Sequence, residues 1–245
     1  MMEPKKPLIL SIDTSTPCSS VALTAGTRKN GEVVASLCLT GKVTHSRRLL
    51  AAIDWIMQES GVAWPAMDGI AVSLGPGSFT GLRIGMATAK GLAAAAEKVL
   101  LGVSTLDSLA AKCVTNRLIC SLLDARKKEV YAAFYRCKND GLSERIGDPV
   151  VLTPADLAAS IHEPVLLVGD GVRAYGEVLQ AILQEKCMIA PAALHEPSAA
   201  SLGMLAGELL EKGRILDVAE GVPMYVRSSD AELNLLKNVG SVMKR

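Results

Sequence analysis

A glycine-rich segment in the first third of the chain constrains the fold more than any other part of the sequence. It covers residues 73–91 and reads SLGPGSFTGLRIGMATAKG. The apolar run at residues 70–74 leads into it and predicts a buried strand. A helix is predicted to follow, because small residues recur at every fourth position and share one face. A second helix or a sheet can approach that face closely; the small residues are Gly81, Gly85, Ala89 and Ala93.

The turn between this strand and this helix is typical of a segment that contacts a neighbouring group, rather than of one that catalyses bond breaking. Glycine lets the backbone approach a neighbouring group, and a helix N-terminus presents unpaired N–H groups and a partial positive charge. The segment lacks the lysine that a G-x-x-x-x-G-K-[ST] phosphate loop requires. Pro76 and Thr80 stand where a G-x-S-x-G serine-hydrolase motif around Ser78 would need glycines. A serine hydrolase is therefore disfavoured.

The length and charge of the chain limit the kinds of protein that it can be. Its 245 residues allow one large domain or two compact lobes. Hydrophobic residues make up 49% and charged residues 21%, which fits a well-packed globular protein. The formal net charge of +1 argues against broad electrostatic capture of nucleic acid or of an acidic membrane. This net charge is still compatible with an RNA that is bound by a partner protein.

The cysteines and the apolar runs predict a cytoplasmic protein. A zinc or redox site would need clustered ligands, and no C-x-x-C pair occurs, so we expect free thiols and no metal. The apolar run at residues 8–12 is too short for a signal core, and no apolar stretch is long and uninterrupted enough to span a membrane. The six cysteines are Cys18, Cys38, Cys113, Cys120, Cys137 and Cys187.

The first half of the chain predicts an α/β lobe that starts with an antiparallel meander. A turn with an Asn-Gly signal at residues 27–31 separates its second and third strands. Ser104 or Thr105 can cap a short helix at the end of this half. The expected elements are strands at residues 8–12, 20–24, 33–39, 69–74 and 99–103, and helices at about 46–60 and from residue 80.

The second half repeats the pattern. The run LICSLLD at residues 118–124 resembles LILSID at residues 8–13, and each is an apolar strand that ends in an aspartate. We therefore predict two similar α/β lobes, at residues 1–105 and 106–227, followed by a tail at 228–245 that is a short helix or disordered. The further elements expected are strands at residues 130–134, 150–152 and 165–168, and helices from 154, near 174–184 and at about 198–212.

Two aspartates end equivalent strands, and two interpretations of them are open. Asp13 and Asp124 can face each other across an interlobe cleft and hold a metal–nucleotide complex, or each can cap a tight turn through its own backbone. Both interpretations apply to Asp13, because residues with hydroxyl side chains follow it. For Asp124 the turn-capping role is favoured. A Gly-Asp-Gly turn between a strand and a helix is a further place for a nucleotide. The candidate nucleotide-binding residues are Asp13, Ser15, Gly75, Gly77, Asp124, Gly169 and Gly171.

The histidines exclude a helix-borne metal pair. They are His45, His162 and His195, and no H-x-x-x-H or H-E-x-x-H spacing occurs. His45 lies at a helix start, where it contacts a partner or is solvated. His162 and His195 lie in His-Glu-Pro loops and are expected at the surface.

Apolar stripes on two helices have two explanations that the sequence leaves open. Leu49, Ile53, Ile56 and Met57 share one face of the helix at 46–60, and Leu82 and Met86 lie beside the small-residue row of the next helix. They pack inside the chain or form a helical dimer interface.

Five segments, in order, resemble the TsaB (YeaZ) family. They are LILSIDTST from Leu8, THSRRLL from Thr44, GPGSFTGLRIG from Gly75, DARKKEVY from Asp124 and PMYVR from Pro223. The resemblance runs from about residue 8 to 227, and the glycine segment is its most specific part. It implies an actin-like ATPase (ribonuclease-H-like) fold with two lobes.

The resemblance also implies a function. Members of this family are related to TsaD, the catalytic subunit that transfers threonylcarbamoyl to adenosine 37 of tRNAs reading ANN codons, and have lost its metal-binding histidines. The implied role is a non-catalytic partner that dimerises with TsaD, with TsaE as an ATP-using third protein. The chain itself then requires no cofactor, ATP or ADP belongs to the complex, and tRNA is contacted through partners. A glycoprotease activity has no supporting residues.

The resemblance further implies which helices contact TsaD, namely those that follow His45 and Thr80. One departure concerns this region, because the family usually has a glutamate where this chain has Arg47, which removes a capping-box contact to Thr44. The expected interface residues are His45, Leu49, Ile53, Leu82, Arg83, Gly85, Met86 and Ala89.

Two other function classes remain. An autonomous kinase or ATPase would use Asp13 and Asp124, and a homodimeric regulator would bind nucleotide tightly without a partner.

Overall fold

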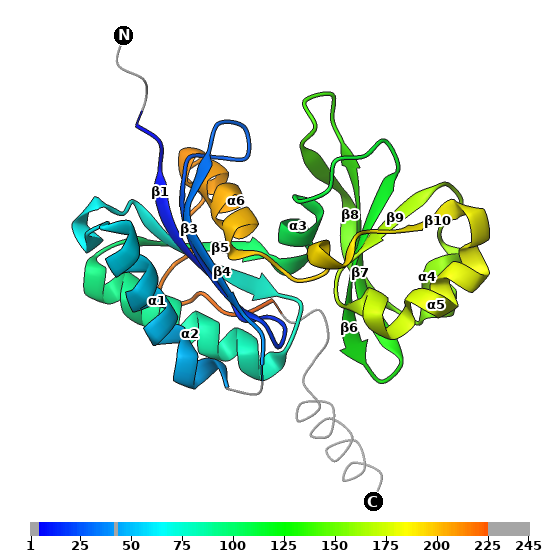
Figure 1. Ribbon diagram of the computed structural model, residues 1–245, viewed down its shortest axis with the longest axis horizontal. Helices are drawn as coiled ribbons and strands as arrows, with labels where there is room; N and C mark the ends of the chain where they lie inside the picture. The colour runs from blue at the N-terminus through cyan, green and yellow to red at the C-terminus, as the bar shows by residue number, and fades with distance from the viewer. Residues whose placement is uncertain (1–4, 42–43, 225–245) are drawn as a thin grey trace, which may run out of the picture.

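The computed structural model describes residues 5–41 and 44–224 and shows two lobes side by side (Figure 1). Each lobe is built on a five-stranded mixed sheet flanked by helices. The first lobe contains β1 (Leu8–Asp13), β2 (Ser19–Ala25), β3 (Glu32–Leu39), α1 (His45–Ser60), β4 (Gly69–Gly75), α2 (Phe79–Ala96) and β5 (Val99–Ser104). The chain continues with α3 (Thr105–Ala110), β6 (Leu118–Arg126), β7 (Glu129–Cys137), β8 (Ser143–Leu152), α4 (Pro154–Ala159), β9 (Val165–Val168), α5 (Gly171–Leu183), β10 (Cys187–Ile189) and α6 (Ala199–Glu211).

The two sheets have the same topology. The strand order is β3-β2-β1-β4-β5 in the first and, read from the equivalent edge, β8-β7-β6-β9-β10 in the second. In each sheet the first three strands along the chain pair antiparallel, and the other two join parallel. The repeat predicted from the two aspartate-ended strands is confirmed, and the fold is the duplicated, actin-like arrangement.

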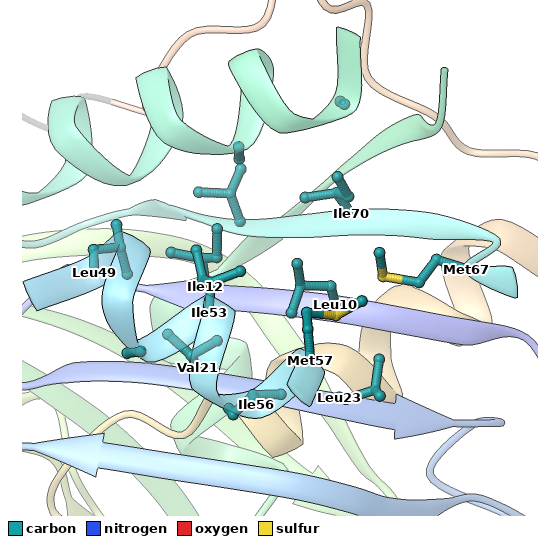
Figure 2. Close-up of a cluster of buried hydrophobic side chains, with 14 of the residues drawn as sticks. Leu10, Ile12, Val21, Leu23, Leu49, Ile53, Ile56, Met57, Met67 and Ile70 are labelled. Carbon is teal, nitrogen blue, oxygen red and sulfur yellow. The ribbon is translucent and has the colours of Figure 1, made fainter. Parts of the chain in front are cut away.

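Helices α1 and α2 cover one face of the first sheet. Figure 2 shows Leu49, Ile53 and Ile56 of α1 directed at Leu10 and Val21 of the strands. Buried residues of α1 recur at three- and four-residue spacing, which aligns them on the side of the helix that meets the sheet. Full burial of each such side chain stabilises the fold by roughly 1.5–3 kcal/mol, so this layer is the main core of the first lobe.

Helix α6 covers the opposite face of the first sheet, although it follows the whole second sheet in the chain. Leu202 packs with Ile9 and Leu101. The Ser11 hydroxyl donates to the Ala199 carbonyl over 2.7 Å. The boundary predicted at residues 105/106 therefore separates the two sheets, but the helix predicted within the second lobe returns to the first. The predicted tail at 228–245 lies outside the described residues.

The second lobe differs from its predicted elements at both edges of the sheet. Strand β8 starts at Ser143 rather than at residue 150, and β10 was not predicted at all. Strand β10 is three residues long and follows a short 3₁₀ turn, so it has no alternating pattern to detect. Helices α4 and α5 pack on one face of this sheet and α3 on the other. The α3 and α6 helices contact each other between the two sheets (Figure 1).

Candidate functional site

The glycine-rich turn lies directly on the loop that follows β1. The Ser78 N–H donates to the Ser15 carbonyl over 2.6 Å, and a side chain at Gly77 would collide with Ser15. Helix α2 starts at this point, where the Ser78 hydroxyl accepts from the Gly81 N–H at 3.2 Å. The Thr14 hydroxyl donates to the Gly81 carbonyl at 2.7 Å. The small residues of α2 therefore accommodate a loop of the same lobe.

Asp13 is buried at the end of β1, next to the loop on which this turn packs. One of its carboxylate oxygens accepts from the Ser15 N–H at 2.9 Å and from the Ser15 hydroxyl at 2.6 Å. The other oxygen, Oδ2, has no hydrogen-bond partner among the described residues. Burial raises the pKa of Asp13, although hydrogen bonds from Ser15 act against this shift. The turn-capping role of Asp13, one of two interpretations left open by the sequence, is confirmed.

Four of the predicted nucleotide-binding residues belong to this sealed cluster. Asp13 and Ser15 are each 1% exposed, and Gly75 is buried as well. Gly77, half-buried, packs on Ser15. With this burial, the Asp13 carboxylate is closed to a phosphate in this conformation.

The other three predicted residues come together in the second lobe. The Asp124 carboxylate accepts from the Arg126 N–H at 2.8 Å, so it also caps a turn. The Asp124 N–H donates to the Asp170 carboxylate at 3.1 Å. Gly169 has φ +119° and lies against the Leu122 carbonyl, where a side chain would collide. The turn from Gly169 to Gly171 is therefore built for close approach to the end of β6.

A pocket of about 390 Å³ lies between the lobes next to this turn. The sequence did not predict Arg126, Arg173 or Glu196 there, because these three residues come from separate segments. Arg173 and Glu196 form an ion pair within it. Burial raises the pKa of Asp170 to about 6, and the Glu196 and Asp124 carboxylates contribute to the increase. The lining residues are Pro17, Cys18, Thr40, Asp124, Arg126, Asp170, Arg173, Ala174 and Glu196.

Most of the predicted interface residues are core residues. Because α1 and α2 direct these side chains at their own sheet, the expectation that they form an interface is corrected. Gly85 is buried against Thr14. The exposed fractions are 1% for Leu49, 2% for Ile53, 1% for Leu82, 5% for Met86 and 0% for Ala89.

Other residues form the outer surface of the same two helices. Leu50 is 60% exposed, Trp55 49% and Phe79 37%. Arg83 is exposed and its guanidinium lies 3.8 Å from the centroid of the Phe79 ring, a cation–π contact within α2. We call Leu50, Trp55, Phe79 and Arg83 the outer helix face. Large exposed apolar side chains on neighbouring helices are candidates for an interaction surface.

His45 stands at the start of α1, next to this face. Its Nδ1 lies 2.5 Å from the Ser19 hydroxyl, and burial, together with the Arg48 guanidinium, lowers its pKa. Arg48 donates to the Ser19 hydroxyl at 2.8 Å as well. Thr44 precedes the helix, and its own side chain makes no capping bond.

His195 was predicted at the surface but is 5% exposed. Its Nδ1 accepts a hydrogen bond from the Gly169 N–H at 3.3 Å, so His195 helps to hold the turn at Gly169 in place. His162 is exposed, as predicted.

The described part of the chain contains no cluster of three histidine, cysteine or acidic side chains arranged to hold a metal. Within the same residues, no helix combines the length and the apolar character that crossing a membrane requires.

Comparison with known proteins gives one consistent family. The family model described as TsaD, tRNA N6-adenosine threonylcarbamoyltransferase, matches residues 40–235. The tRNA threonylcarbamoyladenosine biosynthesis protein TsaB of Bacillus subtilis is 32% identical over 234 residues, which cover 94% of this chain and 98% of that protein. The Escherichia coli protein of the same name is 32% identical over 237 residues, covering 91% and 96%.

A solved structure gives the same result. YeaZ from Pseudomonas aeruginosa superimposes with a TM-score of 0.74 at 30% identity, covering 89% of this chain and 99% of that one.

Proposed function

The chain belongs to the TsaB (YeaZ) family, and on that premise we propose that it takes part in making threonylcarbamoyladenosine in tRNA, as a non-catalytic subunit that dimerises with the transferase TsaD and activates it. TsaE and the tRNA substrate join through the same complex, and ATP or ADP is bound there rather than required by this chain. The complex works in the cytoplasm.

The outer helix face is the observation that carries this proposal. It presents Leu50, Trp55 and Phe79 on two adjacent helices whose opposite sides are already packed on the sheet. An aromatic and aliphatic surface of this kind, with an arginine beside it, has the composition of a protein interface.

The match to the TsaD family model supports the choice of partner. A chain that fits the model of its proposed partner shares that partner's fold over residues 40–235. Two related subunits can pair through equivalent surfaces, as two identical subunits do about a two-fold axis. The corresponding helices of TsaD are therefore the surface that the outer helix face fits.

The sealed Asp13 cluster supports a non-catalytic role. A kinase or ATPase that used Asp13 would need its carboxylate open to a metal–nucleotide complex. Here it is 1% exposed and bonded to Ser15, the residue on which the glycine turn packs. The packing therefore favours a scaffold over a kinase or an ATPase.

The interlobe pocket favours a second candidate, a nucleotide-binding regulator that acts without TsaD. Two arginines and three carboxylates line the pocket and can bind a polar ligand. Calorimetry of the isolated chain with magnesium ATP and with ADP distinguishes the two: tight binding supports the regulator, and the absence of heat supports the scaffold.

Light scattering during size-exclusion chromatography tests the first proposal. The chain is measured alone, which also reports any homodimer, and then mixed with the TsaD of the same organism. We expect a new peak that contains both proteins and is lost with Leu50→Glu. Val178→Glu is the matched control, because Val178 is 50% exposed on α5 of the other lobe. An unchanged profile in the mixture, or equal loss with both variants, would refute the proposal.

A further inference from the structure

Two cysteines lie side by side at one end of the first sheet. Cys18 comes immediately before β2, and Cys38 is the second-last residue of β3. The register of the two strands pairs Ser20 with Cys38, so Cys18 is two residues from the position opposite Cys38. Their sulfur atoms are 2.8 Å apart. We propose that this pair is a thiol-modification site, at which a low-molecular-weight disulfide oxidises Cys18 and Cys38 to a reversible intramolecular disulfide.

The two thiols differ in access, and this sets the order of reaction. Cys38 is exposed on the edge strand, whereas Cys18 is 3% exposed. A small disulfide such as oxidised glutathione therefore meets Cys38 first. Burial raises the pKa of the Cys18 thiol, and Cys38 raises it further, so Cys18 is the less reactive thiol of the two.

The chemistry balances in two exchange steps. The Cys38 thiolate attacks one sulfur of the small disulfide, a mixed disulfide forms, and one thiolate leaves. Cys18 then loses its proton to solvent and attacks the Cys38 sulfur, which releases the second small thiol. The two cysteines are oxidised by two electrons in total, and one small disulfide is reduced to two thiols.

Another cysteine provides the contrast. Cys137 is half-buried, and its thiol contacts the backbone carbonyl of Cys113 at 3.4 Å. It therefore serves as a control for general thiol oxidation.

The position of the pair gives the modification a structural effect. Cys18 lines the interlobe pocket together with Pro17 and Thr40. The Pro17 carbonyl accepts from Arg48 at 2.7 Å, and the Ser19 hydroxyl accepts from the same side chain. A bond between Cys18 and Cys38 therefore ties the end of β3 to the segment that lines the pocket and anchors the start of α1. This proposal is independent of the function proposed above.

Peptide mapping of the native full-length chain tests the inference. The reduced protein is incubated with oxidised glutathione, remaining thiols are blocked with iodoacetamide, and a digest is analysed by mass spectrometry without reduction. We expect a linked peptide that contains both Cys18 and Cys38, lighter by two hydrogen atoms than the sum of its parts. Reduction with dithiothreitol should separate it again.

Three variants distinguish the site from random oxidation. Cys18→Ser should stop at the first step and keep glutathione on Cys38, Cys38→Ser should give neither product, and Cys137→Ser should react like the unmodified chain. Circular dichroism checks that each variant is folded, and Cys18→Ala replaces Cys18→Ser if the latter is not. Glutathione on Cys38 of the unmodified chain without any linked peptide, a link that forms only in denaturant, or no reaction at all would overturn the proposal.

Discussion

The Thr14 hydroxyl donates a hydrogen bond to the Gly81 carbonyl over 2.7 Å, so the first turn of α2 rests on the loop that follows β1. One turn later, a methyl group at Gly85 would collide with the same threonine side chain. The row of small residues is therefore a packing requirement of this lobe.

A pair of glycine variants tests that requirement. Gly85→Ala should destabilise the chain by about 1–3 kcal/mol, because the new methyl group forces Thr14 out of place. Gly91→Ala should stabilise it by about 0.5–1 kcal/mol, because Gly91 lies on the same helix with open space around it. Urea denaturation monitored by circular dichroism measures both; destabilisation of equal size in the two variants would contradict the close approach at Gly85.

Substitutions at two residues of α1 should distinguish an effect on folding stability from an effect on binding. Ile53→Ala should cost about 2–5 kcal/mol of folding free energy, because Ile53 is 2% exposed in the main core. Leu50→Ala, at a residue 60% exposed, should change folding by at most about 0.5 kcal/mol and weaken binding to TsaD. Denaturation curves and titration of TsaD measure the two effects. A folding cost at Leu50 as large as that at Ile53 would place both in the core.

Asp170 should make stability depend on pH. Burial raises its pKa in the folded chain to about 6, from an ordinary value of 3.8. Between these values the folded state binds more protons than the unfolded state, so this carboxyl lowers stability as pH rises through that window.

Asp170→Asn should remove this dependence and keep an acceptor for the Asp124 N–H. Relative to the unmodified chain, the variant should gain nothing near pH 4 and on the order of 1–3 kcal/mol at pH 7. Denaturation midpoints across this pH range provide the measurement. A difference that stays constant with pH would mean that Asp170 titrates normally.

Arg28 should contribute more to stability than a surface arginine. It lies in the turn between β2 and β3, pairs with Glu208 of α6 at 2.7 Å and donates to the Ser143 carbonyl of the second lobe at 2.9 Å. Because both side chains of the ion pair are less than one-fifth exposed, Arg28→Ala should cost about 1.5–3 kcal/mol.

Arg136→Ala is the comparison, since Arg136 and its partner Glu163 are about half exposed and such a pair is worth about 0–1 kcal/mol. The melting temperatures of the two variants, measured by thermal unfolding, test this difference. Equal melting temperatures would show that the Arg28 contact does not hold the lobes together.

Local patterns predicted the first sheet and the central strands of the second. The strand that ends at Asp13 and the one that contains Asp124 both carry apolar runs followed by a polar turn, and each aspartate caps that turn as short-range chemistry dictates. The turn at residues 27–31 formed as predicted because its hydrogen bonds are local: the Gly31 N–H donates to the Thr27 carbonyl at 2.7 Å.

Contacts between distant segments were not predictable from such patterns. The apolar stripe of α1 was visible, but periodicity does not say whether a sheet of the same chain or another protein covers it. The resemblance implied an interface that included Leu49 and Ile53. Similarly, a loop position made His195 look exposed, although it accepts from Gly169, 26 residues away. The interlobe pocket combines segments from both halves and has no sequence signature of its own.

The return of α6 to the first sheet has a consequence for the order of folding. Ser11 and Ala199 are bonded across 188 residues of sequence, so the first sheet leaves the ribosome long before the helix that covers Ile9 and Leu101. The second sheet, by contrast, is formed from one continuous stretch, Leu118 to Ile189. The lobe that is translated first is therefore the lobe that is completed last, and during that interval its uncovered apolar face is open to aggregation.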